Sequence, residues 1–123
     1  MKTILVDTNA LMAIGEFGVD IFSELDRCSD FPYKVAILEG TISELEKISQ
    51  EQRGKYKLAA KLALSIIKSK NVKVIKSLGN VDDLLTAYSR KGYLILTQDM
   101  ALKRRLQKPY LTIRQKKKVV MVG

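Results

Sequence analysis

The sequence of 123 residues contains no histidine and a single cysteine, Cys28. The absence of histidine excludes a Ser-His-Asp triad, a histidine general base and every metal site that contains histidine. The single cysteine excludes an internal disulfide framework and fits a reducing compartment, so we expect a cytoplasmic protein. Any catalysis must therefore use carboxylates, hydroxyls, lysines or the lone thiol.

Long apolar runs are absent as well. No run approaches the ~18 residues needed to cross a bilayer, so no membrane partner is expected. The N-terminus leads directly into an expected strand without a long apolar stretch or a small-residue cleavage site, which predicts that there is no signal peptide. Because 46% of the residues are hydrophobic, we expect one globular domain over residues 1–123 with a single core.

The net charge of +9 is unevenly distributed along the chain. Residues 1–50 carry 4 basic and 9 acidic side chains, whereas residues 51–79 carry 8 and 1. Residues 100–123 carry 8 basic side chains and no acid. This segregation predicts a polyanionic partner, most often nucleic acid. A lysine-rich surface of the thermophilic kind would explain much of the total charge, but it explains the acid-free end less well.

Short apolar segments alternate with helical patterns. The segments that predict strands are 3–6, 33–38, 72–75, 93–96, 110–113 and 119–122. The segments that predict helices are 19–27, 42–50, 55–68, 81–91 and 100–106. This alternation predicts an α/β fold with a mostly parallel central sheet that is covered on both faces.

Acidic residues follow four of the predicted strands. Asp7 ends the first strand, and Glu44 is expected in the first turn of the helix after the second. Asp82 and Asp83 open the helix after the third strand, and Asp99 follows the fourth. Ligands of such sheets bind beyond the carboxyl ends of the strands, so we expect these carboxylates to converge at one edge.

Each acid also has a purely structural interpretation, because carboxylates and hydroxyls are common at helix N-termini. The capping candidates are Asp7 or Thr8, the capping-box pairs Thr41/Glu44 and Ser43/Glu46, Asn80 with Asp82 and Asp83, and Asp99. For any single acid, the structural and the functional interpretation are about equally supported. Their joint position at buried strand ends favours a site, since a helix can be capped by serine or threonine without a charge.

Neighbouring carboxylates repel one another and resist desolvation, so they remain ionised only when a cation compensates them. An all-oxygen set without histidine or cysteine suits Mg²⁺ or Mn²⁺. Such ions keep several waters and accept phosphate oxygens as further ligands. Beside two basic blocks, this set predicts a phosphodiesterase whose metal lowers the pKa of a water and stabilises the leaving oxygen.

The chain resembles the PIN-domain ribonucleases. The resemblance covers essentially the whole chain and is carried by "ILVDTNALM", "ISELEKI", "VDDLLTAYSRKGYLILTQD" and "ALKRRL". The ending, "YLTIRQKKK", is most similar to archaeal relatives of the ribosome-biogenesis branch rather than to the toxin branch. The resemblance implies a PIN-like α/β/α sandwich with about five strands and helices on both faces. It also implies one PIN-like domain, 1–123, with a basic C-terminal strand segment, 110–123.

The resemblance further implies an endonuclease that cuts single-stranded or structured RNA and leaves a 3′-hydroxyl and a 5′-phosphate. By position, the family's catalytic, metal-binding acids correspond to Asp7, Glu44, Asp82 and Asp99. Asn9 matches the polar residue that orients the first aspartate, and Thr97 matches the small hydroxyl residue two positions before the last.

Two positions leave alternatives open. We choose Asp82 as the ligand because it places Leu85 at the family's buried isoleucine position, whereas Asp83 would place Thr86 there. Asp83 remains the alternate ligand. Many relatives carry another acid two positions after the last aspartate, where this chain has Ala101. The number of bound Mg²⁺ or Mn²⁺ ions, one or two, therefore stays open.

Two basic clusters are candidates for RNA binding: Lys103, Arg104 and Arg105, and Lys116, Lys117 and Lys118. The first cluster could instead be an exposed helical face, and the second could protect an edge strand from pairing. The partners expected are RNA, with a second copy of the chain, a ribosome-assembly protein or an antitoxin as further candidates.

Three functions are compatible with the resemblance to PIN-domain ribonucleases. The first is an active metal-dependent endoribonuclease, for example in rRNA processing. The second is a non-catalytic RNA-binding or assembly module, which the four intact acids disfavour. The third is the toxin of a toxin–antitoxin pair, which would use the same chemistry. A phosphoacceptor receiver domain also has acids at strand ends, but the order of acids in this chain does not fit it.

Overall fold

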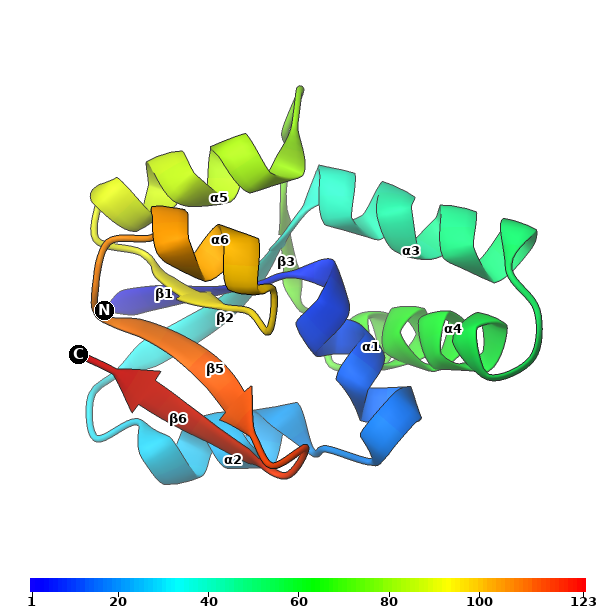
Figure 1. The fold of residues 1–123 in the computed structure, drawn as a ribbon, viewed down its shortest axis with the longest axis horizontal. Coiled ribbons are helices and arrows are strands. Elements are labelled where there is room, and N and C mark those ends of the chain that lie inside the picture. Colours follow the sequence, from blue (N-terminus) through cyan, green and yellow to red (C-terminus); the bar gives the residue numbers. More distant parts are fainter.

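Strands and helices alternate along the chain (Figure 1). The computed structural model describes residues 1–123. The strands are β1 (Lys2–Val6), β2 (Tyr33–Leu38), β3 (Lys73–Ile75), β4 (Leu94–Leu96), β5 (Tyr110–Arg114) and β6 (Lys118–Val122). The helices are α1 (Thr8–Phe17), α2 (Ile21–Cys28), α3 (Glu39–Glu51), α4 (Gly54–Ser69), α5 (Val81–Arg90) and α6 (Met100–Arg105).

All strands form one sheet in the order β3-β2-β1-β4-β5-β6. Neighbouring strands are parallel except β6, which pairs antiparallel with β5. The predicted, mostly parallel α/β sandwich is therefore confirmed. The sheet has six strands rather than about five, because the basic segment 110–123 folds into a hairpin of β5 and β6.

Successive residues of the central strand β1 point to opposite faces of the sheet, which divides the core into two clusters. Ile4 and Val6 join a cluster of 20 buried residues that includes side chains of α1, α2, α3 and α4. Leu5 joins a cluster of 7 that includes side chains of α5 and α6. Figure 1 shows α5 and α6 above the sheet and α2 below it. No helix has the length and apolar character needed to span a membrane.

The helix α1 was missed in the sequence, because its residues "TNALMAIGEF" are mostly apolar and show no clear polar face. Its buried position explains that composition, since Ala10, Leu11, Met12 and Ala13 are all inside the core. The helix also packs closely on α4. A Cβ at Gly15 would lie 2.6 Å from the Cα of Ala59, so only glycine fits there.

The helix α3 begins three residues earlier than predicted, at Glu39, directly after β2. Glu44 therefore lies in the second turn rather than the first, and neither predicted capping box forms. The buried Thr41 hydroxyl makes no hydrogen bond. The early start is possible because the loop before α5 satisfies the first turn: the Gly40 N–H donates to Ser77 Oγ at 3.0 Å.

Candidate active site

Asp7 leaves the end of β1 and caps α1. Its Oδ1 accepts a hydrogen bond from the Ala10 N–H at 2.8 Å, and its Oδ2 accepts one from the hydroxyl of Thr97. Only 5% of Asp7 is exposed. Burial is the largest influence on this carboxyl group and raises its pKa to about 6, with smaller contributions from Asp99 and Asp82. The two hydrogen bonds lower the pKa and oppose the burial.

Asp99 follows the last residue of β4, Leu96, by three positions. Its Oδ1 accepts from the Leu102 N–H at 3.1 Å and so caps α6. Its own N–H donates to Thr97 Oγ1 at 3.0 Å. Thr97 is fully buried and thus connects the two strand-end acids. The capping interpretation and the clustering of acids at one edge therefore both hold for Asp7 and Asp99.

Glu44 reaches the same edge from α3, where its Oε1 accepts a hydrogen bond from the hydroxyl of Thr8. The bond joins the second turn of α3 to the first residue of α1. One carboxylate oxygen of Glu44 is thereby held, and the other has no partner within the protein. Asn9, the predicted orienting residue, borders the same cavity but makes no hydrogen bond to Asp7.

Asp82 and Asp83 lie in the first turn of α5, which the side chain of Asn80 caps by accepting from the Asp83 N–H at 2.9 Å. Asp82 borders the cavity with the other acids. Asp83 does not, and its Oδ1 is paired with Arg105 Nη2 at 2.6 Å on the surface. The side chain of Asp83 is 67% exposed. The choice of Asp82 over Asp83 as the residue facing the site thus has geometric support.

The acids enclose a cavity of about 410 Å³ at the carboxyl edge of the sheet. Its lining is Asp7, Thr8, Asn9, Glu44, Lys47, Ile48, Val81, Asp82 and Asp99. A larger cavity lies at the opposite end of the sheet, but it contains a single carboxylate and none of the predicted site residues. Size alone does not identify the site here, and the convergence of four carboxylates is the stronger criterion.

None of the four lining acids forms an ion pair, since the chain contains only the pairs Arg27–Glu24 and Arg105–Asp83. No three acids lie near enough to one another to hold a metal ion without moving. Carboxylates without a cation between them repel one another. The donors are nevertheless all hard oxygens, and the buried carboxylate of Asp7 lacks a cationic partner. Their chemistry fits a Mg²⁺ or Mn²⁺ ion that keeps several waters.

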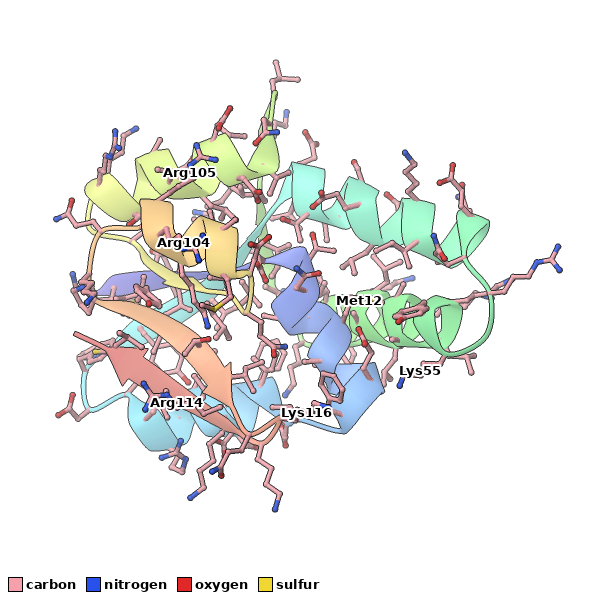
Figure 2. The ribbon with its side chains drawn as sticks, viewed as in Figure 1. Met12, Lys55, Arg104, Arg105, Arg114 and Lys116 are labelled. Carbon is pink, nitrogen blue, oxygen red and sulfur yellow. The ribbon has the colours of Figure 1, made fainter.

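The predicted RNA-binding residues lie outside the cavity lining. Figure 2 shows Arg104 and Arg105 on α6, above Arg114 and Lys116 of the C-terminal hairpin. Arg105 is engaged with Asp83. Lys116 belongs to the turn between β5 and β6, and its Nζ lies 4.8 Å from the centre of the Phe17 ring. These residues can contact only flanking parts of a ligand that is bound at the acids.

Lys47 borders the acid cavity and was not among the predicted site residues. It follows Glu44 by three residues on α3, a spacing that places both side chains on one helical face. In the sequence, the spacing of Glu44 and Lys47 is the feature that could have identified Lys47 as a site residue. Lys47 is exposed and makes no ion pair, although it shares the cavity with four carboxylates. Its ammonium group is therefore free to contact a negatively charged ligand.

The chain is similar to a known protein family and to two curated proteins. A family model described as a PIN like domain matches residues 4–116. The chain is 30% identical over 131 residues to ribonuclease VapC4 of Methanocaldococcus jannaschii, covering 100% of this chain and 98% of that protein. It is 30% identical over 106 residues to ribonuclease VapC9 of Archaeoglobus fulgidus, covering 85% of this chain and 76% of that protein.

Among solved structures, the PIN domain endonuclease Utp24 has a similar fold, with a TM-score of 0.77 at 23% identity over 97% of this chain and 90% of that one. Both curated relatives are named ribonucleases, which supports nuclease activity. The family match spans nearly the whole chain and confirms the resemblance found in the sequence. This chain belongs to the PIN-like domain family.

Proposed function

We propose that this protein is an endoribonuclease that hydrolyses RNA phosphodiester bonds with the help of Mg²⁺ or Mn²⁺. One observation carries the proposal: Asp7, Glu44, Asp82 and Asp99 border one cavity, around a buried carboxylate that has no cationic partner. The names of both curated relatives support the substrate class.

Asp7, Asp82 and Asp99 would hold the metal, with Asp83 as the alternate ligand if its pair with Arg105 opens. When bound, the ion would supply a water of lowered pKa and stabilise the negative charge on the leaving oxygen. The hydrogen bonds from Ala10 and Thr97 lower the pKa of Asp7 and so favour the ionised form that a metal requires.

The remaining side chains would act on water and phosphate. Glu44, fixed through one oxygen by Thr8, has its other oxygen available to accept a proton from the attacking water. Lys47 would bind a non-bridging oxygen of the scissile phosphate. The water oxygen then forms a bond to phosphorus, the bond from phosphorus to the 3′ oxygen breaks, and that oxygen takes up a proton from solvent. The products are a 5′-phosphate and a 3′-hydroxyl.

Cleavage of a mixed panel of single-stranded and structured RNAs tests the proposal. Wild type and Asp7→Asn are compared in Mg²⁺, Mn²⁺ and EDTA, with Glu51→Gln as a control that neutralises an exposed carboxylate outside the cavity. We expect metal-dependent internal cuts from wild type and Glu51→Gln and none from Asp7→Asn. Cutting that persists in EDTA or in Asp7→Asn would contradict the proposed chemistry.

The biological role has two candidates with the same chemistry. The similarity to archaeal VapC ribonucleases fits a toxin that a protein antitoxin restrains as well as it fits a role in rRNA processing. Inducible expression distinguishes the two. A toxin arrests growth when wild type is expressed without its inhibitor, and Asp7→Asn does not. RNA retention without any cutting would instead favour the non-catalytic binding module.

A further inference from the structure

The helix α4 presents apolar side chains to solvent. Leu58 and Leu62 are 67% and 43% exposed, and the half-buried Ile66 follows one turn after Leu62. Successive members of this set are four residues apart, so they lie along one face of the helix. We call Leu58, Leu62 and Ile66 the α4 stripe. The core cluster that α4 joins through its buried residues contains none of them.

A cavity of about 350 Å³ adjoins the α4 stripe, where α4 meets the end of α1 and the start of α2. Ile66 borders this cavity together with Ile14, Val19 and Phe22. Apolar pockets of this kind receive the anchoring side chains of a binding partner. The cavity shares no lining residue with the acid cavity, so the two surfaces are separate.

Positive charge surrounds the α4 stripe. Lys55 lies one turn before Leu58, and Lys61 lies one turn after it. Lys70 follows Ile66 by four residues, at the end of the helix. None of the three lysines forms an ion pair, and α4 contains no acidic residue. Figure 2 marks Lys55 on α4.

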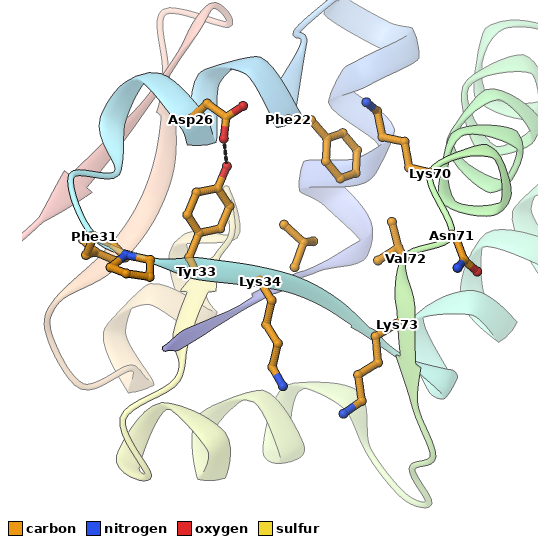
Figure 3. Close-up of a pocket in the computed structure, with 11 residues that line it drawn as sticks. Phe22, Asp26, Phe31, Tyr33, Lys34, Lys70, Asn71, Val72 and Lys73 are labelled. Carbon is orange, nitrogen blue, oxygen red and sulfur yellow. Dashed lines mark hydrogen bonds between the residues drawn. The ribbon is translucent and has the colours of Figure 1, made fainter.

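Lys70 brings positive charge to the cavity itself. It extends from the end of α4 toward α2, with its Nζ 4.9 Å from the centre of the Phe22 ring (Figure 3). The single carboxylate in the cavity lining, Asp20, caps α2 by accepting from the N–H of Ser23 at 3.1 Å and from its hydroxyl at 2.8 Å. Asp20 forms no ion pair with Lys70, so the lysine is available to an acid of a partner.

The charge and the shape of this surface decide between occupants. A second copy would place two acid-free α4 helices against each other, and the lysines would repel. A lipid surface would cover the exposed leucines but would leave the adjoining cavity unfilled. A protein helix with an apolar stripe and acidic flanks satisfies both features, because its side chains enter the cavity and its acids face the lysines.

We propose that the α4 stripe and its adjoining cavity dock an amphipathic helix of a partner protein, in which glutamates or aspartates flank the apolar side chains. The apolar side chains of that helix cover the stripe and fill the cavity. Its acids pair with Lys55, Lys61 and Lys70. The proposal does not depend on nuclease activity, since this surface and the acid cavity have no residue in common.

Selection from a peptide library tests the chemistry of the occupant. The displayed peptides are helix-forming and about 18 residues long, with leucines fixed along one face. Each position that flanks the leucines carries glutamate, glutamine or lysine. The library is screened against the wild-type protein, and we expect glutamate to be enriched at the flanking positions.

Leu58→Gln/Leu62→Gln tests the apolar surface. Glutamine removes the apolar contact and has nearly the helix propensity of leucine, so α4 should remain folded. The most enriched peptide should bind this variant about 10- to 100-fold more weakly than wild type. Leu78→Gln is the matched control, because Leu78 is 92% exposed in the loop before α5. It should stay within about 2-fold of wild type.

Lys55→Gln/Lys61→Gln tests the positive flanks. We expect this variant to bind the peptide about 3- to 10-fold more weakly at low salt, with a smaller difference at ~0.5 M salt. Lys34→Gln/Lys73→Gln removes the same charge from exposed positions of β2 and β3. It should leave the affinity within about 2-fold of wild type.

Several results would overturn the proposal. These are a library that yields no enriched peptide, enrichment of lysine or glutamine at the flanks, and equal affinity of the peptide for wild type and Leu58→Gln/Leu62→Gln. Sedimentation of the protein alone and binding to phosphatidylglycerol-containing vesicles test the other occupants. A wild-type dimer that this variant dissociates would assign the surface to a second copy. Vesicle binding that this variant abolishes would assign it to lipid.

Discussion

The hydroxyl of Thr97 donates a hydrogen bond to Oδ2 of Asp7, a residue 90 positions earlier in the chain. The same oxygen of Thr97 accepts from the Asp99 N–H at 3.0 Å. One buried hydroxyl therefore holds the ends of β1 and β4 together and sets the position of two of the four acids. It also stabilises the ionised form of Asp7 against burial, which raises the pKa of that carboxyl group to about 6.

Thr97→Val removes the hydroxyl and keeps the shape of the side chain. We expect nuclease activity at pH 7 to fall about 10- to 100-fold, because the residue that orients a metal ligand is lost. The pKa of Asp7 should rise further, since the bond from Thr97 lowers it, and the acidic limb of the pH–rate profile should move to higher pH. Thr97→Ser, which keeps the hydroxyl, should retain most of the activity. Equal activity of the valine and serine variants would contradict this role.

Asp7→Asn should stabilise the metal-free protein at high pH. The folded-state pKa of about 6 lies above the ordinary value of 3.8, so the protonated form favours folding below pH 3.8 and this contribution is lost as the pH rises through 6. At pH 8 the buried charge costs about 3 kcal/mol. Asparagine carries no charge and caps a helix as well as aspartate does.

Urea unfolding in EDTA measures this effect. The free energy of unfolding of Asp7→Asn should exceed that of wild type by about 1–3 kcal/mol at pH 8 and match it near pH 4. A less stable Asp7→Asn protein at pH 8 would show that the carboxylate is already compensated. Addition of Mn²⁺ should raise the melting temperature of wild type above that of its EDTA control and leave Asp7→Asn unchanged.

Asp82→Asn and Asp83→Asn should differ sharply although the residues are adjacent. Asp82 borders the acid cavity, so its neutral variant should lose most activity and Mn²⁺ binding. Asp83 lies outside the cavity in an exposed pair with Arg105, which contributes about 0–1 kcal/mol to stability. We expect Asp83→Asn to keep activity within about 3-fold of wild type on that basis. The opposite order would assign the metal-binding position to Asp83.

Lys47→Gln should raise the KM for RNA several-fold, because the only cation that borders the acid cavity is removed. Binding of Mn²⁺, measured by calorimetry without RNA, should be unchanged or tighter, since a like charge near the metal is lost. Lys61→Gln, on the exposed face of α4, is the matched control and should alter neither quantity. Weaker Mn²⁺ binding in Lys47→Gln would indicate a structural rather than a phosphate-binding role.

Much of the fold could be predicted because strands and helices follow local periodicity. The short apolar segments identified the strands, and the acids that follow four of them indicated a site at the carboxyl edge. The helix α1 escaped because four consecutive residues, Ala10 to Ala13, are buried, so no polar face marks its period there. The start of α3 escaped because its first turn is satisfied by Ser77, which lies 37 positions away from Gly40.

The sequence by itself determined the oxygen-only chemistry of the site, the acids at strand ends and the separation of basic from acidic segments. These follow from residue type and from spacing within a few residues. Only the tertiary structure decided that Asp82 rather than Asp83 faces the cavity and that Lys47 joins it. Burial and convergence depend on which distant segments pair in the sheet and pack over it, and no local pattern contains that information.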